Sequence, residues 1–244
     1  RKNRESAFTR VTMWVWPSGH YPPRITKHIR GNLMILFFDT ETTGIRKGGF
    51  IPRVVQIGAL LTDNEGKMVG ELNLLLQPDG FVNIPVEASN VHGFSTEHVK
   101  KYGVDRYMGL SAFFAMLEQA DTVVAHNAEY DMDLLTCEID YYANIHNDPT
   151  AVAVWSEIYK EAESKVFCTM LNSRDILMMP LSDAQARFFR DTGNDQKFKN
   201  PRLIEAYRHF FNTDFEGAHD AMADVRACKD VYFKLHSLKS EVAA

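Results

Sequence analysis

The feature that most constrains the fold is an apolar run, residues 33–38, that ends in two carboxylates, Asp39 and Glu41. Such a run is typical of a strand buried on both faces. Residues two apart in a strand project to the same face, so both carboxylates would leave the end of the strand together. They repel each other unless a cation, a proton or solvent intervenes. Taken alone, the stretch favours a surface turn, and only further acids could reverse that interpretation.

The segments that follow predict strands first and then a mixture of helices and strands. Two of the three early strands would pair through a tight hairpin turn, because residues 63–66, which include Asn64 and Gly66, separate two β-rich runs. Later periodicity favours helices that alternate with short strands, which implies a mixed sheet with helices packed on it. The predicted strands are residues 54–62, 67–77, 122–125 and 166–170, and the predicted helices are 110–119, 130–142, 201–211 (with Pro201 in the first turn) and 221–235.

Charge limits the partners that the chain could bind. The net charge of the 244 residues is -5, but residues 1–32 carry seven Lys or Arg and one acid, which leaves 20 basic and 31 acidic residues beyond them. An acidic body cannot bind nucleic acid through a broad cationic surface. A polyanion would have to be held by a local basic patch or by bound metal.

Composition also suggests how the chain is organised. We expect a basic N-terminal extension over residues 1–32, a functional domain over 33–238 and a tail over 239–244. Because Met34 directly precedes the apolar run, the extension is either an appended segment or a native basic arm. No apolar run reaches the roughly 20 residues that span a bilayer, so we expect no membrane association. The three cysteines lack zinc or disulfide spacing, which favours a cytoplasmic protein.

Two later stretches carry acids beside histidines. His126 and Asp131 fall where a strand should give way to a helix, and His219 and Asp224 flank the start of the last predicted helix. Each has a simpler interpretation, since acids near a helix start favour the helix dipole and Asp220 is a plausible N-cap. If Asp220 caps the helix and His219 lies on the loop before it, however, His219 and Asp224 can approach one pocket.

Three or four carboxylates with one histidine are what two-metal hydrolysis of a phosphodiester requires. The carboxylates would hold two divalent cations about 4 Å apart. Oxygen ligands favour Mg²⁺ or Mn²⁺ over zinc. A histidine with a pKa near neutrality could take the proton of the attacking water.

The three motifs FDTETTG, HNAEYD and HDAMAD, in this order, resemble those of the DEDDh branch of 3′–5′ exonucleases, the group of DnaQ-like proofreading subunits, RNase T and oligoribonuclease. The resemblance runs from about residue 33 to residue 235. It implies an α/β fold of the RNase H-like type, with a five-stranded mixed sheet whose first three strands are antiparallel and which is flanked by helices. It also implies two divalent cations, Mg²⁺ or Mn²⁺.

Carried over by position, the resemblance assigns a role to each motif residue. Metal would be held by Asp39, Glu41 and Asp224, with Asp131 at the second ion directly or through water, and His219 would be the general base. Asp133 competes with Asp131, but the spacing from Asn127 through Tyr130 matches Asp131. The resemblance further implies contacts to the terminal nucleotide from Thr42, Thr43, Gly44, His92 and Asn127.

The expected activity is metal-dependent removal of nucleoside 5′-monophosphates from a 3′ end, with single-stranded DNA as the first substrate to consider. An exoribonuclease of the RNase T or oligoribonuclease type and a non-catalytic RNase H-like binding module are the alternatives. The resemblance leaves room for a polymerase or a replication or repair complex as partner and for a homodimer.

Nearly ninety residues separate the second and third motifs, more than a compact member of the family needs. The extra length lies in residues 144–165 and 182–199, where inserted helices could shape a substrate channel or bind a partner. Phe188, Phe189 and Phe198 lie there among arginines and lysines. Such a mixture can stack bases and bind phosphates, but we favour phenylalanines in the core with the cations on a solvated face.

Overall fold

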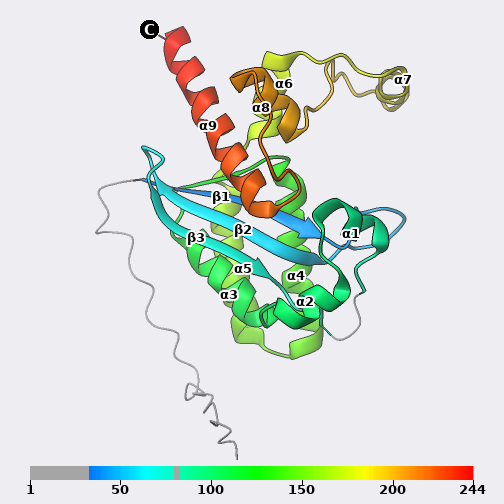
Figure 1. The fold of residues 1–244 in the computed structure, drawn as a ribbon, viewed down its shortest axis with the longest axis vertical. Helices are drawn as coiled ribbons and strands as arrows, with labels where there is room; N and C mark the ends of the chain where they lie inside the picture. The colour runs from blue at the N-terminus through cyan, green and yellow to red at the C-terminus, as the bar shows by residue number, and fades with distance from the viewer. Residues whose placement is uncertain (1–32, 80–82, 244) are drawn as a thin grey trace, which may run out of the picture. The chain divides into compact units, whose positions relative to one another are not determined.

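The computed structural model describes residues 33–79 and 83–243. Its centre is a five-stranded sheet in the order β3-β2-β1-β4-β5 (Figure 1). The strands are β1 (Met34–Thr42), β2 (Val54–Asp63), β3 (Met68–Leu75), β4 (Thr122–Ala125) and β5 (Val166–Cys168). The first three pair antiparallel, whereas β4 and β5 run parallel to β1. The predicted mixed sheet is confirmed, and the predicted extension over residues 1–32 lies outside the described residues.

β1 is buried on both faces because it occupies the middle of the sheet. Leu36 and Phe38 face one hydrophobic core, and Ile35 and Phe37 face another. This alternation explains why the run reads as continuously apolar rather than as one apolar face. Because β4 is parallel to β1, the carboxyl ends of both strands meet at the same edge of the sheet.

Helices cover both faces of the sheet. α3 (Arg106–Glu118), α4 (Ala128–His146) and α5 (Pro149–Glu163) pack with the first core, whereas α9 (Ala221–Ala243) packs on β1 and β2 from the other side (Figure 1). Glu138 fixes α4 in place, since its buried carboxylate pairs with Arg53 and Arg106 and accepts the N–H of Val54. The remaining helices are α1 (Val86–His92), α2 (Thr96–Tyr102), α6 (Thr169–Leu177), α7 (Asp183–Thr192) and α8 (Leu203–Phe211).

Several predicted boundaries are wrong. Pro201 lies before α8, because Arg202 is the N-cap and the helix begins at Leu203. The strand expected at residues 166–170 ends at Cys168, where α6 begins directly. The last helix continues past residue 235 to Ala243, since no glycine or proline stops it. The extents proposed for the functional domain and the tail stay predictions.

The two long insertions do contain helices, as expected, but the prediction of buried phenylalanines is wrong, because Phe188 is exposed and Phe189 and Phe198 are half-buried. α5 lies in the first insertion and buries Trp155 in the main core. α7 lies in the second, and within the described part of the chain none of its residues is buried; Phe188 is 61% exposed. Among the described residues, no helix is long and apolar enough to cross a membrane.

Candidate metal centre and active site

Asp39 and Glu41 lie at the carboxyl end of β1, on one face of the central strand. Asp39 pairs across the ladder with Gly58 and Glu41 with Gln56 on β2, and a register shift follows Glu41. Glu41 is 8% exposed and Asp39 is half-buried. The surface turn favoured by this stretch alone is therefore wrong, because both carboxylates belong to the central strand, at its carboxyl end.

The second motif begins where β4 ends and brings Asp131 to the same edge. Asn127 is the N-cap of α4 in a left-handed conformation, which turns the chain sharply from strand to helix. Asp131, in the first turn of α4, is 4% exposed and its Oδ1 accepts the hydroxyl of Thr40 at 2.7 Å. Asp133 is exposed and pairs with Arg46 at 2.6 Å, so it points away from this cluster.

The third motif adopts the arrangement that would let two of its side chains converge. Asp220 caps α9, since its Oδ1 accepts the N–H groups of Met222 and Ala223. His219 lies on the preceding loop with a φ of 72°, and its N–H donates to Asp224 Oδ2 at 3.2 Å. Donor atoms of Glu41, His219 and Asp224 all lie within 4.8 Å of one another.

Crowding and burial raise the pKa values of the four carboxylates that are expected to hold metal. Burial raises the pKa of Glu41 to about 8, with Asp224 and Asp131 adding repulsion. Burial likewise raises the pKa of Asp131 to about 7, against the hydrogen bond from Thr40, and that of Asp224 to about 6. The pKa of Asp39 is raised well above its usual value by burial and then by Asp131 and Asp224. Without a cation these groups cannot all be ionised at neutral pH.

This donor set fits hard divalent cations. Carboxylate oxygens dominate it, as Mg²⁺ and Mn²⁺ prefer, and the repulsion among them is what bound positive charge would relieve. Because a ring nitrogen of His219 lies within 4.8 Å of carboxylate oxygens of both Glu41 and Asp224, the ring can serve either as a base or as a ligand.

The residues expected to contact the terminal nucleotide differ in how much of each is available to bind a ligand. Thr42 Oγ1 donates to the carbonyl of Gly44, which also accepts the hydroxyl of Tyr130 at 3.0 Å. Thr43 is 2% exposed, its hydroxyl accepts the N–H of Arg53, and its own N–H donates to the carbonyl of Arg53, so it offers little to a ligand. Gly44 has a φ of 143°, a conformation that favours glycine.

His92 and Asn127 complete that set. Burial lowers the pKa of His92, and the backbone of Thr42 opposes the shift, which places the ring beside the first motif. Nδ1 of His92 accepts the N–H of Phe94 at 3.1 Å, and the buried Nε2 makes no hydrogen bond within the described part of the chain. Asn127 is exposed and lines the adjoining pocket.

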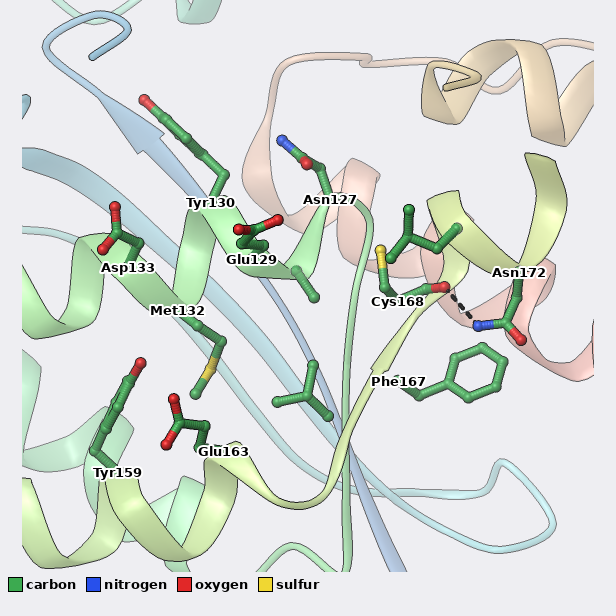
Figure 2. A pocket seen from close by; sticks show the side chains of 13 residues that line it. Asn127, Glu129, Tyr130, Met132, Asp133, Tyr159, Glu163, Phe167, Cys168 and Asn172 are labelled. Atoms are coloured by element: carbon green, nitrogen blue, oxygen red, sulfur yellow. Dashed lines mark hydrogen bonds between the residues drawn. The ribbon is translucent and has the colours of Figure 1, made fainter. Parts of the chain in front are cut away.

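A pocket of about 830 Å³ opens between α4, α5, β5 and the start of α6 (Figure 2), and its lining includes the neighbours of Asp131 on α4 but none of the residues expected to hold metal. Tyr130, Met132, Tyr159 and Phe167 give it an apolar and aromatic wall. Among the described residues that line it, Glu129, Asp133 and Glu163 are acidic and none is Lys or Arg. Such a lining repels phosphate and suits an uncharged planar group with hydrogen-bond donors.

Two contributors to the centre escape sequence analysis. Thr40 holds Asp131, and Gln56 contacts the start of α9. The position of Thr40 between Asp39 and Glu41 is a possible signal, since alternation points it to the opposite face, toward α4. Gln56 offers no such signal, because its partners lie 164 and 165 positions away in the chain.

Comparison with known proteins agrees with this architecture. The exonuclease family RNase T matches residues 36–232. DNA polymerase III subunit epsilon of Treponema pallidum (strain Nichols) is 28% identical over 102 residues, 42% of this chain and 44% of that protein. E. coli exonuclease I in complex with a dT13 oligonucleotide has a TM-score of 0.58 at 20% identity, covering 83% of this chain and 40% of its own. An apo structure of exonuclease I gives 0.60 at 16% identity, covering 84% and 42%.

The chain covers less than half the length of these relatives. At such identities the solved structures establish the fold alone, which is the RNase H-like fold with its five-stranded mixed sheet and flanking helices.

Proposed function

The chain belongs to the RNase T family of exonucleases, as a DnaQ-like member of the DEDDh type, and we propose that it removes nucleoside 5′-monophosphates from the 3′ end of single-stranded DNA. The observation that carries the proposal is the convergence of Glu41, His219 and Asp224 within 4.8 Å, beside Asp39 and Asp131. A non-catalytic module would have no need to keep so many repelling carboxylates together.

In the proposed reaction, Asp39, Glu41, Asp131 and Asp224 hold two divalent cations. When bound, the cations would supply positive charge that offsets the charge accumulating on the phosphate. His219 takes a proton from the attacking water, whose oxygen forms a bond to phosphorus in line with the leaving 3′ oxygen. The bond between phosphorus and that oxygen breaks, and the 3′ oxygen takes a proton from solvent to end as a hydroxyl.

The exposed position of His219 suits this role. A base on a loop reaches solvent and can pass its proton on after each turnover. His92 and Thr42 would meet the terminal nucleotide, and the ring of His92 lies beside the backbone of Thr42.

The acidic pocket along α4 suits a single-stranded substrate. Its lining repels phosphates but offers aromatic surface and carboxylate acceptors, so unpaired bases with amino groups fit it better than a duplex backbone. The E. coli relative solved with dT13 makes DNA the first substrate to test.

The test uses 5′-labelled single-stranded DNA and RNA of one sequence, with Mg²⁺ or Mn²⁺. We expect a ladder of products shortened one nucleotide at a time on DNA, and no ladder from Asp39→Asn protein. A ladder on RNA alone would assign the chain to the exoribonuclease alternative. Absence of products from both substrates with both metals would contradict the proposal and favour a binding module.

We propose, in addition, a polymerase as partner, because a matched relative is the epsilon subunit of DNA polymerase III. The test is co-purification of the tagged protein with the replicative polymerase of its own cell. Recovery of the protein without polymerase at low salt would contradict this part of the proposal alone.

A further inference from the structure

Gln56 on β2 connects the sheet to the first turn of α9. Gln56 is only 2% exposed, and all the polar atoms of its side chain form hydrogen bonds. Oε1 accepts the N–H of Ala221 at 3.2 Å, while Nε2 donates to Asp220 Oδ2 at 3.3 Å and to Asn73 Oδ1 at 2.9 Å. A buried amide with every group satisfied specifies one orientation of its partners.

Gly58 brings the helix close to the same place. A Cβ at this position would lie 2.8 Å from the carbonyl carbon of Ala221 and 3.0 Å from its Cβ. Gly58 is two residues from Gln56 and therefore on the same face of β2. The glycine permits the approach, and the glutamine fixes the direction in which the helix begins.

The same two positions of β2 pair with the acids of β1. Gln56 lies opposite Glu41 and Gly58 opposite Asp39 in the antiparallel ladder. Any shift of α9 on this part of β2 would change the distance from Asp224 to Glu41. Gln56 thus connects the strand position opposite Glu41, in the first motif, to the start of α9, in the third motif.

We propose that Gln56 is a positioning residue of the active centre, which sets the start of α9 so that His219 and Asp224 meet Glu41. This rests on the proposed function. Gln56 has a second effect on the neighbouring acid, since Asp220 Oδ2 accepts its amide while Oδ1 caps α9. Both oxygens of Asp220 are occupied, which keeps a fifth carboxylate from joining the four that are expected to hold metal.

The test compares Gln56→Met with Gln56→Glu and with a control, Gln77→Met. Methionine keeps the volume but removes all three hydrogen bonds, whereas glutamate keeps an acceptor for the Ala221 N–H. Gln77 lies beyond the end of β3 and is exposed, and among the residues that the structure describes its side chain bonds only the carbonyl of Lys100. Three quantities are measured: hydrogen exchange of the Ala221 amide without metal, Mn²⁺ affinity by calorimetry, and the separate values of kcat and KM.

For Gln56→Met we expect faster exchange at Ala221, Mn²⁺ affinity and kcat each lowered by about 10–100-fold, and KM little changed. Gln56→Glu should restore protection of Ala221 but not the position of Asp220, since a carboxylate cannot donate to it, and Gln77→Met should match wild type. Unchanged exchange in the strands β1 and β4 would show that the domain remains folded. Should Gln56→Met fail to fold, Gly58→Ala, which displaces the same turn, is expected to lower metal affinity in the same way.

Faster exchange at Ala221 with wild-type Mn²⁺ affinity and kcat would overturn the proposal, because Gln56 would then support only the helix. A wild-type protein that hydrolyses no oligonucleotide would contradict the proposed function instead. The exchange and calorimetric measurements would still decide the role of Gln56, since neither needs turnover.

Discussion

At the scale of single residues, His219 carries the clearest expected effect. Its left-handed backbone and its hydrogen bond to Asp224 hold it at the cluster, yet its ring is exposed. We expect His219→Ala to retain Mn²⁺ binding within a few-fold and to lower kcat by roughly 10²–10⁴-fold at neutral pH. Calorimetry and steady-state kinetics on single-stranded DNA measure the two effects separately.

The matched control is His209→Ala, which removes another exposed histidine, on α8. It should leave both quantities unchanged. Full activity of His219→Ala would contradict its role as base, whereas loss of metal affinity would make it a ligand.

A second histidine is expected to act on stability. Pro201 can only accept through its carbonyl, so His126 carries its proton on Nε2, which donates at 2.9 Å, and Nδ1 accepts from Thr169 Oγ1. Burial lowers the pKa of His126 to about 4. As pH falls, the unfolded chain therefore protonates His126 before the folded protein does. The stabilisation that neutral His126 gives the fold is complete above about pH 6.5 and is lost as pH falls toward 4.

We expect wild type to exceed His126→Asn in unfolding free energy by on the order of 2 kcal/mol at neutral pH, and the difference to shrink on acidification. Denaturant unfolding of both proteins across this range measures it. A difference that grows toward acid pH would mean that the ring is charged in the folded protein.

At the scale of elements, α7 differs from the helices that pack on the sheet in how little of it is buried. Ser182 and Gln185 form a capping box and Gly193 ends the helix, yet in the described part of the chain α7 buries no residue. Isolated helices of this length are marginal in water, so the caps supply what packing does not.

Removal of α7 should therefore cost the domain little. We expect replacement of residues 182–193 by a Gly-Ser linker to change the unfolding free energy by less than about 1 kcal/mol. Trp155→Ala on α5, the buried counterpart, should cost about 3–5 kcal/mol. Equal losses in the two variants, measured by urea unfolding, would show that α7 packs on the domain.

The elements differ in how far the sequence predicts them. β1, β2, β3 and α9 follow from apolar runs and helical spacing, because their burial is set by neighbours along the whole element. α1 and α2 are short, and their caps at Pro85 and Ser95 are common in loops, so periodicity does not reveal them. The end of β5 depends on tertiary contacts, since Thr169 is buried against His126 and Cys228 as α6 begins.

The same distinction holds within the candidate site. Asp39, Glu41, Asp131, His219 and Asp224 stand in short motifs, so their meeting could be anticipated once β1 and β4 were taken as parallel. The hydrogen bond from the N–H of Arg53 to the Thr43 hydroxyl could not be anticipated, because it depends on how the chain returns into β2.

At the scale of the whole molecule, the carboxylate cluster couples stability to pH and metal. The folded protein without metal binds protons at Asp131, Asp224 and Glu41 up to pH values of about 7, 6 and 8, above the range in which the unfolded chain releases them. The folded state thus holds more protons between about pH 4 and 8, and its stability falls as pH rises through that range.

Divalent cations compete with these protons, so they should stabilise the protein more at about pH 8 than at about pH 5. We expect the rise in Tm caused by saturating Mn²⁺ to be several degrees larger at the higher pH, as measured by thermal unfolding with and without EDTA. Asp131→Asn removes one charge without changing shape. It should raise the Tm of the metal-free protein at the higher pH and reduce the response to Mn²⁺. An equal rise in Tm with Mn²⁺ at both pH values would mean that the carboxylates are already ionised without metal. Relief of their mutual repulsion would then not explain why the protein binds cations.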